Sequence, residues 1–422
     1  MESYIVRQPI LDENQHAIGY EILYQEENGA FIQTDSSAAN AIENFLMQMD
    51  GDNFLDGRIA FLNFTRNLLV RNVPRIFSNR KLVIQVEDTI IVNPLSHALV
   101  LKYKNQGFKI AIVDFEFAPR YFGILDIVDY IKVNFKNSGD SSIENIVNIG
   151  NSFGKTVIAY NVDTKEAYDR AVRCGCKCMQ GAYVAEKLPS TIKKMNYLQG
   201  NFFMLMVAIT KEDPDLDEIE QLISRDVTLT YQLLRLVNSA YFALRTRAKS
   251  VKQALVILGL GQLKQWIYLL SFRQDDGSMP DELIKISFLR ANFCSELYEF
   301  ASNLPISKSE AYLLGMFSTL HKLMDIPMEE AMKQLSVSDD IKNALITGEG
   351  GCGCLISLVK SYEKADWKQM LADAEKLNIP QNIITQKYFE CVESVNATWS
   401  SLMKNNDNAV DEDEEENNNN QK

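Results

Sequence analysis

Six polar residues stand where short apolar runs of the sequence end, and their side chains could form a binding site. They are Glu21, Asn63, Gln85, Asp114, Lys132 and Tyr160. Together they supply carboxylates, carboxamides, an ammonium group and a phenol, which bind polar ligands or exchange protons. A single polar residue at such a place carries no information, because it can simply cap a strand. Six from separate runs favour a pocket, with strand capping as the alternative interpretation.

The apolar runs before these residues are rich in β-branched residues and alternate with longer helical stretches. They cover residues 59–62, 82–84, 109–113, 130–133 and 156–159, and an earlier strand is expected over residues 17–23. The runs recur every ~20–30 residues, the length of one strand-helix unit. This pattern predicts a parallel sheet that closes into an eight-stranded α/β barrel, and chemistry in such barrels lies at the carboxyl ends of the strands.

After Ser190 the strand pattern stops and helical spacing takes over. Asp217 with Glu220, and Ser250 with Gln253, are typical of helix starts, and apolar residues follow each pair at helical spacing. We therefore predict a multi-domain chain, with a barrel over residues 1–190 and an all-α domain over residues 197–385. The acidic, asparagine-rich end over residues 405–422 is expected to be a disordered tail.

Composition argues against several classes of partner. The net charge of −13 disfavours broad attraction to nucleic acid or to an anionic membrane. No segment is long and apolar enough to span a bilayer. The seven cysteines are odd in number and lack the spacing of a disulfide framework. We expect a cytoplasmic protein without a nucleic-acid or membrane partner.

Motifs in the first half resemble, in order, those of the EAL family of cyclic di-GMP phosphodiesterases. The matching segments are Gln8-Pro9-Ile10, Gly19-Tyr20-Glu21-Ile22-Leu23, Phe61-Leu62-Asn63, Asp114-Phe115, Tyr130-Ile131-Lys132-Val133-Asn134, residues 159–164 and Gln180-Gly181-Ala182-Tyr183. The resemblance covers about residues 3–189. It implies a TIM-like (β/α) barrel of the EAL type. Its candidate ligand-binding residues are Gln8, Glu21, Asn63, Asp114 and Gln180.

The same resemblance implies a hydrolytic site with two divalent cations, and the sequence departs from it at three ligand positions. Gln85 and Tyr160 stand where the family has glutamates, and Val113 replaces the first aspartate of a pair. Two cations would share only two carboxylates, which is too little charge to hold them. We therefore predict a pseudo-enzyme without a cofactor. Its vestiges are Lys132 and Asp163 from the catalytic set, and Glu21, Asn63 and Asp114 from the metal set.

The sequence leaves open whether cyclic di-GMP still binds. Gln8 and Gln180 match family positions that line the ligand pocket, which favours binding. Against it, Gln25 stands where the family has an arginine that reaches a phosphate. Glu116 also begins a loop that replaces a glycine-containing one, and a carboxylate beside a dianionic ligand is unfavourable.

The second half resembles HDOD domains, which are related to HD-type metal phosphohydrolases. The similar segments are residues 222–226, 233–242 and 250–261. Where the hydrolases have His-Asp, this chain has Ser318-Thr319, and His321 lies nearby but out of register. The combination resembles a bacterial two-domain EAL-HDOD signalling family. It implies a regulatory protein that acts on protein partners of unknown identity, with its oligomeric state open. The alternative is a weak cyclic di-GMP phosphodiesterase, using Mg or Mn, or a cyclic di-GMP receptor.

Overall fold

A computed structural model of the chain describes most of both predicted domains. The described residues are 3–26, 54–115, 122–136, 139–187, 199–211, 213–224, 227–238, 248, 250–270, 281–324, 326–333, 335, 337–397 and 399. The predicted tail over residues 405–422, the loop over residues 116–120 and the Gln25 side chain lie outside this description.

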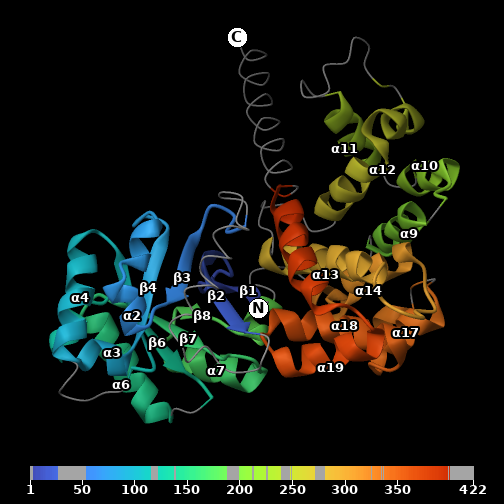
Figure 1. Ribbon diagram of the computed structural model, residues 1–422. Helices are drawn as coiled ribbons and strands as arrows, with labels where there is room; N and C mark the ends of the chain where they lie inside the picture. Colours follow the sequence, from blue (N-terminus) through green and yellow to red (C-terminus); the bar gives the residue numbers. More distant parts are fainter. Residues whose placement is uncertain are drawn as a thin grey trace, which may run out of the picture.

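Eight strands form a closed barrel in chain order, which confirms the predicted fold (Figure 1). They are β1 (Ser3–Leu11), β2 (Ala17–Glu26), β3 (Ile59–Asn63), β4 (Leu82–Glu87), β5 (Lys109–Val113), β6 (Tyr130–Asn134), β7 (Thr156–Tyr160) and β8 (Cys178–Met179). Neighbours from β2 to β8 are parallel, but β1 is antiparallel to both β2 and β8. The turn between β1 and β2 is too short for a parallel crossover, and Asp12 stabilises it by accepting from the amides of Asn14 and His16. A hairpin in place of a crossover lets the barrel close within a short segment.

Short helices connect the parallel strands. They are α2 (Arg66–Val70), η1 (Val73–Ile76), α3 (Asp88–Val92), α4 (Pro94–Asn105), α5 (Phe122–Leu125), α6 (Asp140–Ser152), α7 (Lys165–Arg173) and α8 (Ala182–Ala185). The local sequence determines where several of these helices begin. The Asn93 side chain caps α4 by accepting from two backbone amides, and Thr164 caps α7 by accepting from one, that of Ala167.

All the regular secondary structure of the second half, over its described residues, is helical. Its helices are α9 (Gln199–Thr210), α10 (Leu216–Ser224), α11 (Val227–Val237), α12 (Val251–Leu270), α13 (Asp281–Tyr298), α14 (Lys308–Phe317), α15 (Leu320–Met324), α16 (Met328–Lys333), α17 (Asp339–Ile346), α18 (Gly350–Glu363) and α19 (Trp367–Leu377), and residues 381–397 are also helical. The capping residue predicted at Asp217 is wrong by two positions, because Asp215 accepts from the backbone amides of Asp217 and Glu218 and so caps α10. Within the described chain, no helix is long and apolar enough to cross a membrane. The exact domain limits stay a prediction.

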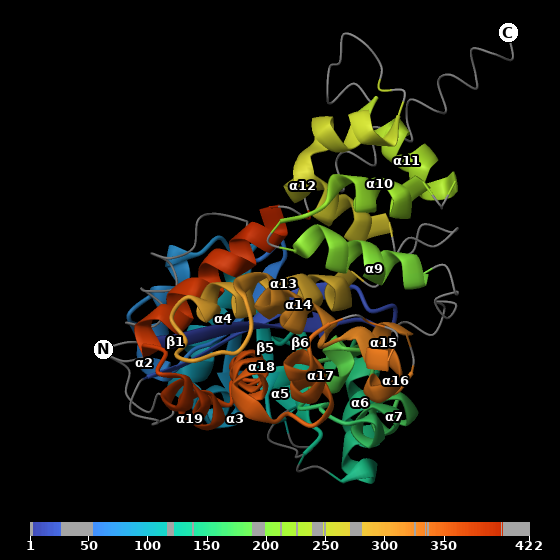
Figure 2. The same ribbon diagram turned by 90° about the vertical axis from the view of Figure 1, so that its right-hand side faces the viewer.

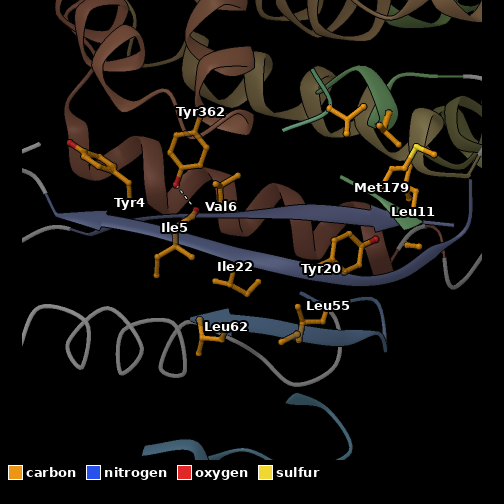
Figure 3. Close-up of a cluster of buried hydrophobic side chains, with 14 of the residues drawn as sticks. Tyr4, Ile5, Val6, Leu11, Tyr20, Ile22, Leu55, Leu62, Met179 and Tyr362 are labelled. Carbon is orange, nitrogen blue, oxygen red and sulfur yellow. Dashed lines mark hydrogen bonds between the residues drawn. The ribbon is translucent and has the colours of Figure 1, made fainter. Parts of the chain in front are cut away.

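The barrel and the C-terminal helices share one hydrophobic core. On β1, Tyr4 stacks on Trp367 of α19 with ring centroids 5.5 Å apart. The Tyr362 hydroxyl of α18 donates to the backbone carbonyl of Ile5 at 2.8 Å (Figure 3). Because β1 is not followed by a crossover helix, these C-terminal helices provide its cover. A second core joins α9–α12 to α13 and α14, and α9–α12 lie apart from the barrel in both views (Figures 1 and 2).

Candidate functional site

A small apolar layer inside the barrel forms the floor of the candidate site. It consists of Ile10, Phe61, Val83, Ala111, Ile158 and Cys178. Alternate residues of a strand point to the same face, so the next inward position along each strand lies one layer higher. These positions hold Gln8, Asn63, Gln85, Val113, Tyr160 and Gln180. The period of two therefore brings the predicted residues towards one end of the barrel.

Glu21 is at the centre of this layer, and its carboxylate is fully engaged by neighbours. Its Oε1 lies 2.7 Å from Lys132 Nζ and accepts from Gln85 Nε2 at 2.7 Å. Its Oε2 accepts from Gln180 Nε2. Lys132 and Gln85 are each only 1% exposed. Burial alone would raise the pKa of Glu21, but the Lys132 ammonium and the two amides outweigh burial and lower it.

Tyr160 and Asp114 form a second contact at the same end of the barrel. The Tyr160 hydroxyl donates to Asp114 Oδ1, and Lys132 Nζ lies 5.2 Å from the centre of the Tyr160 ring. Burial and the Asp114 carboxylate together raise the pKa of Tyr160, which keeps the phenol protonated. Asp114 has a φ of +56°, a left-handed conformation that Asp tolerates better than most residues. The Tyr160 phenol thus serves as a hydrogen-bond donor in the site.

The structure brings most, but not all, predicted residues to one cavity. Gln8, Glu21, Asp114, Asp163 and Gln180 line a cavity of about 750 Å³. Asp163 also accepts from the amide of Ala182, which opens α8. Asn63 is exposed and does not line the cavity, and its backbone carbonyl accepts from the Tyr24 hydroxyl.

Helices α13 and α18 supply the second wall of this cavity, which sequence reasoning missed. Their lining residues include Lys285, Arg290, Glu363 and Lys364. Gln8 Nε2 donates to the backbone carbonyl of Glu363 at 2.9 Å, and Gln8 Oε1 accepts from Gln180 at 3.2 Å. Of the two glutamines predicted to line the pocket, Gln8 therefore touches the helical domain directly, and Gln180 is bonded to Gln8. No local spacing in the sequence signals this contact.

Arg290 joins the barrel to the helical domain in a buried ion cluster. It is 3% exposed, and its guanidinium donates to both carboxylate oxygens of Glu363. Its Nη2 also donates to Glu186, which follows α8 of the barrel, at 2.7 Å. Burial would raise the pKa of Glu186, but Arg290 lowers it to about 2. Burial, together with the nearby Glu186 carboxylate, raises the pKa of Glu363 against the lowering effect of Arg290.

The same cluster contacts Ser318, one of the two residues that the resemblance places where HD-type hydrolases carry His-Asp. Arg290 Nη1 donates to the Ser318 hydroxyl at 3.3 Å, and Thr319 exchanges a hydrogen bond with Ser287. Burial lowers the pKa of His321 to about 4, so its imidazole is neutral near pH 7. Over the described residues, no group of three or more His, Cys, Asp or Glu could hold a metal ion.

Comparison with known proteins agrees with both halves of this architecture. A family model of the EAL domain matches residues 30–187, and one of the HDOD domain matches residues 196–339. The chain is an EAL-HDOD protein. It is 28% identical over 378 residues to the uncharacterized protein YuxH of Bacillus subtilis (strain 168), over 87% of this chain and 92% of YuxH.

A second relative of this EAL-HDOD protein is the cyclic di-GMP phosphodiesterase CdgJ of Vibrio cholerae. The two are 28% identical over 397 residues, which cover 92% of this chain and 91% of CdgJ. Among solved structures, the FimX EAL domain from Pseudomonas aeruginosa bound to c-di-GMP is 15% identical, with a TM-score of 0.36, over 43% of this chain and 88% of that one.

Active EAL phosphodiesterases use Mg²⁺ or Mn²⁺, and the residues of this EAL-HDOD protein do not fit such a pair of ions. Both oxygens of Glu21 are already bonded to Lys132 and the two glutamines. Val113 has no donor atom, and the Tyr160 hydroxyl is directed to Asp114. A hard cation needs several free anionic oxygens, and a buried ammonium beside the main carboxylate repels it.

Proposed function

We propose that this protein is a non-catalytic signalling protein that acts through protein partners. The observation that carries the proposal is the buried ion pair between Lys132 and Glu21, with a distance of 2.7 Å. The ammonium supplies the positive charge that a metal ion would bring, but it cannot polarise a phosphate or activate water as a metal does. The partner itself and the oligomeric state are left unassigned.

The size of the electrostatic loss supports absence of hydrolysis. Three ligand positions hold Gln85, Val113 and Tyr160 in place of carboxylates. Removal of one well-placed electrostatic group from an active site costs about 3–4 kcal/mol of transition-state stabilisation. Three such losses, together with an internal ammonium group, leave no group able to generate a nucleophile.

We expect the purified protein to form no linear product from cyclic di-GMP with either Mg²⁺ or Mn²⁺. Product is measured by chromatography at high protein concentration, with CdgJ as the positive control for the assay. Wild type and Glu21→Gln should give the same background, because Glu21 holds no metal in this proposal. Metal-dependent product that is lost in Glu21→Gln would show that the protein is a weak phosphodiesterase.

A second candidate function, as a cyclic di-GMP receptor, is favoured by the cavity itself. Its volume of about 750 Å³ lies within the range of ~300–1,000 Å³ found for ligand pockets. Gln8 and Gln180, which match ligand-lining positions of the family, both line it and are hydrogen-bonded to each other. Titration calorimetry without a divalent metal tests this function separately from hydrolysis, and absence of heat at high micromolar ligand would exclude it.

A further inference from the structure

The helices that form one wall of the cavity are held against the barrel by ion pairs and by a shared hydrophobic core. Arg290 of α13 ties Glu186 of the barrel to Glu363 of α18. The core continues from β1 into α18 and α19. A ligand in the barrel mouth would therefore meet groups of the helical domain at positions that are as well defined as those of the barrel.

Most of the cations around the cavity are already bonded to oxygens of the protein. On the barrel side, Arg7 donates to the Phe54 carbonyl and to Asn396, and Lys132 pairs with Glu21. On the helical side, Lys285 pairs with Asp56, and Arg290 pairs with its two glutamates. Each of these cations is held by protein oxygens, so none is available to a ligand without a large loss of internal bonding.

Lys364 is the exception among the described residues that line the cavity. Its side chain is exposed, and no hydrogen bond or ion pair engages its ammonium. It directly follows Glu363, whose carbonyl accepts from Gln8 at 2.9 Å. Lys364 therefore lines the same cavity as Gln8 and directly follows the residue that bonds to it.

The barrel lacks a cation of this kind at its own family position. The resemblance implies a phosphate-reaching arginine where this chain has Gln25. A phosphodiester in the cavity would face the carboxylates of Glu21 and Asp114, so it needs a compensating charge. A flexible lysine ammonium is a common phosphate-binding group and can supply that charge.

We propose that the helical domain completes the ligand site of the barrel, with Lys364 as the residue that contacts a phosphate of a bound cyclic dinucleotide. This inference rests on the receptor function proposed above. It makes binding a property of the two-domain chain, because the lost barrel cation is replaced by one from α18. Lys364 is a binding residue only, without a part in hydrolysis.

The test is titration calorimetry of the full chain with cyclic di-GMP, in the absence of divalent metal. Lys364→Ala should weaken binding about tenfold, the effect of losing one charge-assisted hydrogen bond. Lys364→Arg should retain wild-type affinity. Lys368→Ala removes an exposed lysine of α19 that does not line the cavity, and it should leave affinity unchanged. A parallel titration with cyclic di-AMP separates contacts to the phosphates, which both ligands share, from contacts to guanine.

A purely structural role for Lys364 predicts a different pattern. A lysine at the carboxyl end of a helix stabilises the helix dipole, so its removal would lower the thermal midpoint without changing affinity. Equal affinity of Lys364→Ala and wild type overturns the inference while leaving the receptor function intact. Absence of binding by the wild-type chain overturns the receptor function and this inference together.

Discussion

Replacement of Lys132 by methionine is expected to destabilise the protein by about 3–5 kcal/mol at pH 7, the usual cost of leaving a buried charge without its partner. Lys132 is 1% exposed, and its ammonium lies 2.7 Å from Glu21. Methionine keeps the length of the side chain, so the loss arises from the charge rather than from a cavity. The free energy of unfolding is measured by urea denaturation.

The pH dependence of this loss has a defined sign. In the wild type the pKa of Glu21 is lowered, so its contribution to stability is present above the ordinary value of 4.5 and is lost as pH falls through the folded value. In Lys132→Met, burial raises the pKa of the same carboxyl, which then protonates at a higher pH. The stability difference between variant and wild type should therefore shrink from pH 7 to pH 4.

A double variant is the control for this prediction. Adding Glu21→Gln to Lys132→Met removes the unpaired charge and should recover most of the lost stability, since both charges are then absent. If the double variant is no more stable than Lys132→Met, the ion pair is not the source of the effect.

Replacement of Arg290 by methionine is expected to lower the free energy of unfolding by about 3–5 kcal/mol, at least as much as Lys132→Met. The reason is that two buried carboxylates lose the cation they share. The barrel and the C-terminal helices have one core, so we expect calorimetry to record their unfolding as a single transition, shifted to lower temperature. The lost contacts are those of Glu186, Glu363 and Ser318.

The matched control for Arg290 is an ion pair within the helical domain. Glu299 pairs with Lys308 at the surface, away from the barrel, and Glu299→Gln should give no measurable change. If the free energy of unfolding of Arg290→Met lies within about 1 kcal/mol of the wild-type value, as is typical of surface substitutions, the buried cluster does not link the two domains.

The parallel strands of the barrel follow closely from the sequence. The predicted run over residues 109–113 coincides with β5, and the run over residues 59–62 differs from β3 by one residue. Continuous β-branched runs have few alternatives to a buried strand, and the period of two then orders the inward residues. The strand ends predicted that Glu21 and Asp114 share one site, and the family resemblance added Gln8 and Gln180; all four line one cavity.

The helical wall and the reversed first strand could not be predicted in this way. Gln8 and Glu363 touch although they lie 355 positions apart, and no local pattern encodes such a contact. Likewise, the sequence predicts departures from the family's ligands at Gln85 and Tyr160, but the groups that bond to Glu21 are seen only in the structure. No sequence pattern indicates the role of Arg290, because that role depends on a contact with Glu186 from the other domain.

The most direct test is whether the barrel of the intact chain binds Mn²⁺ through Glu21. Free Mn²⁺ is measured by electron paramagnetic resonance as the ion is added to wild type and to Glu21→Gln. The acidic tail is present in both proteins, so weak binding there cancels in the comparison. Because Lys132 already fills the place of a cation beside Glu21, both proteins should remove the same amount of Mn²⁺ from solution. At least one additional tightly bound ion per wild-type chain, absent from Glu21→Gln, would contradict the non-catalytic interpretation of this site.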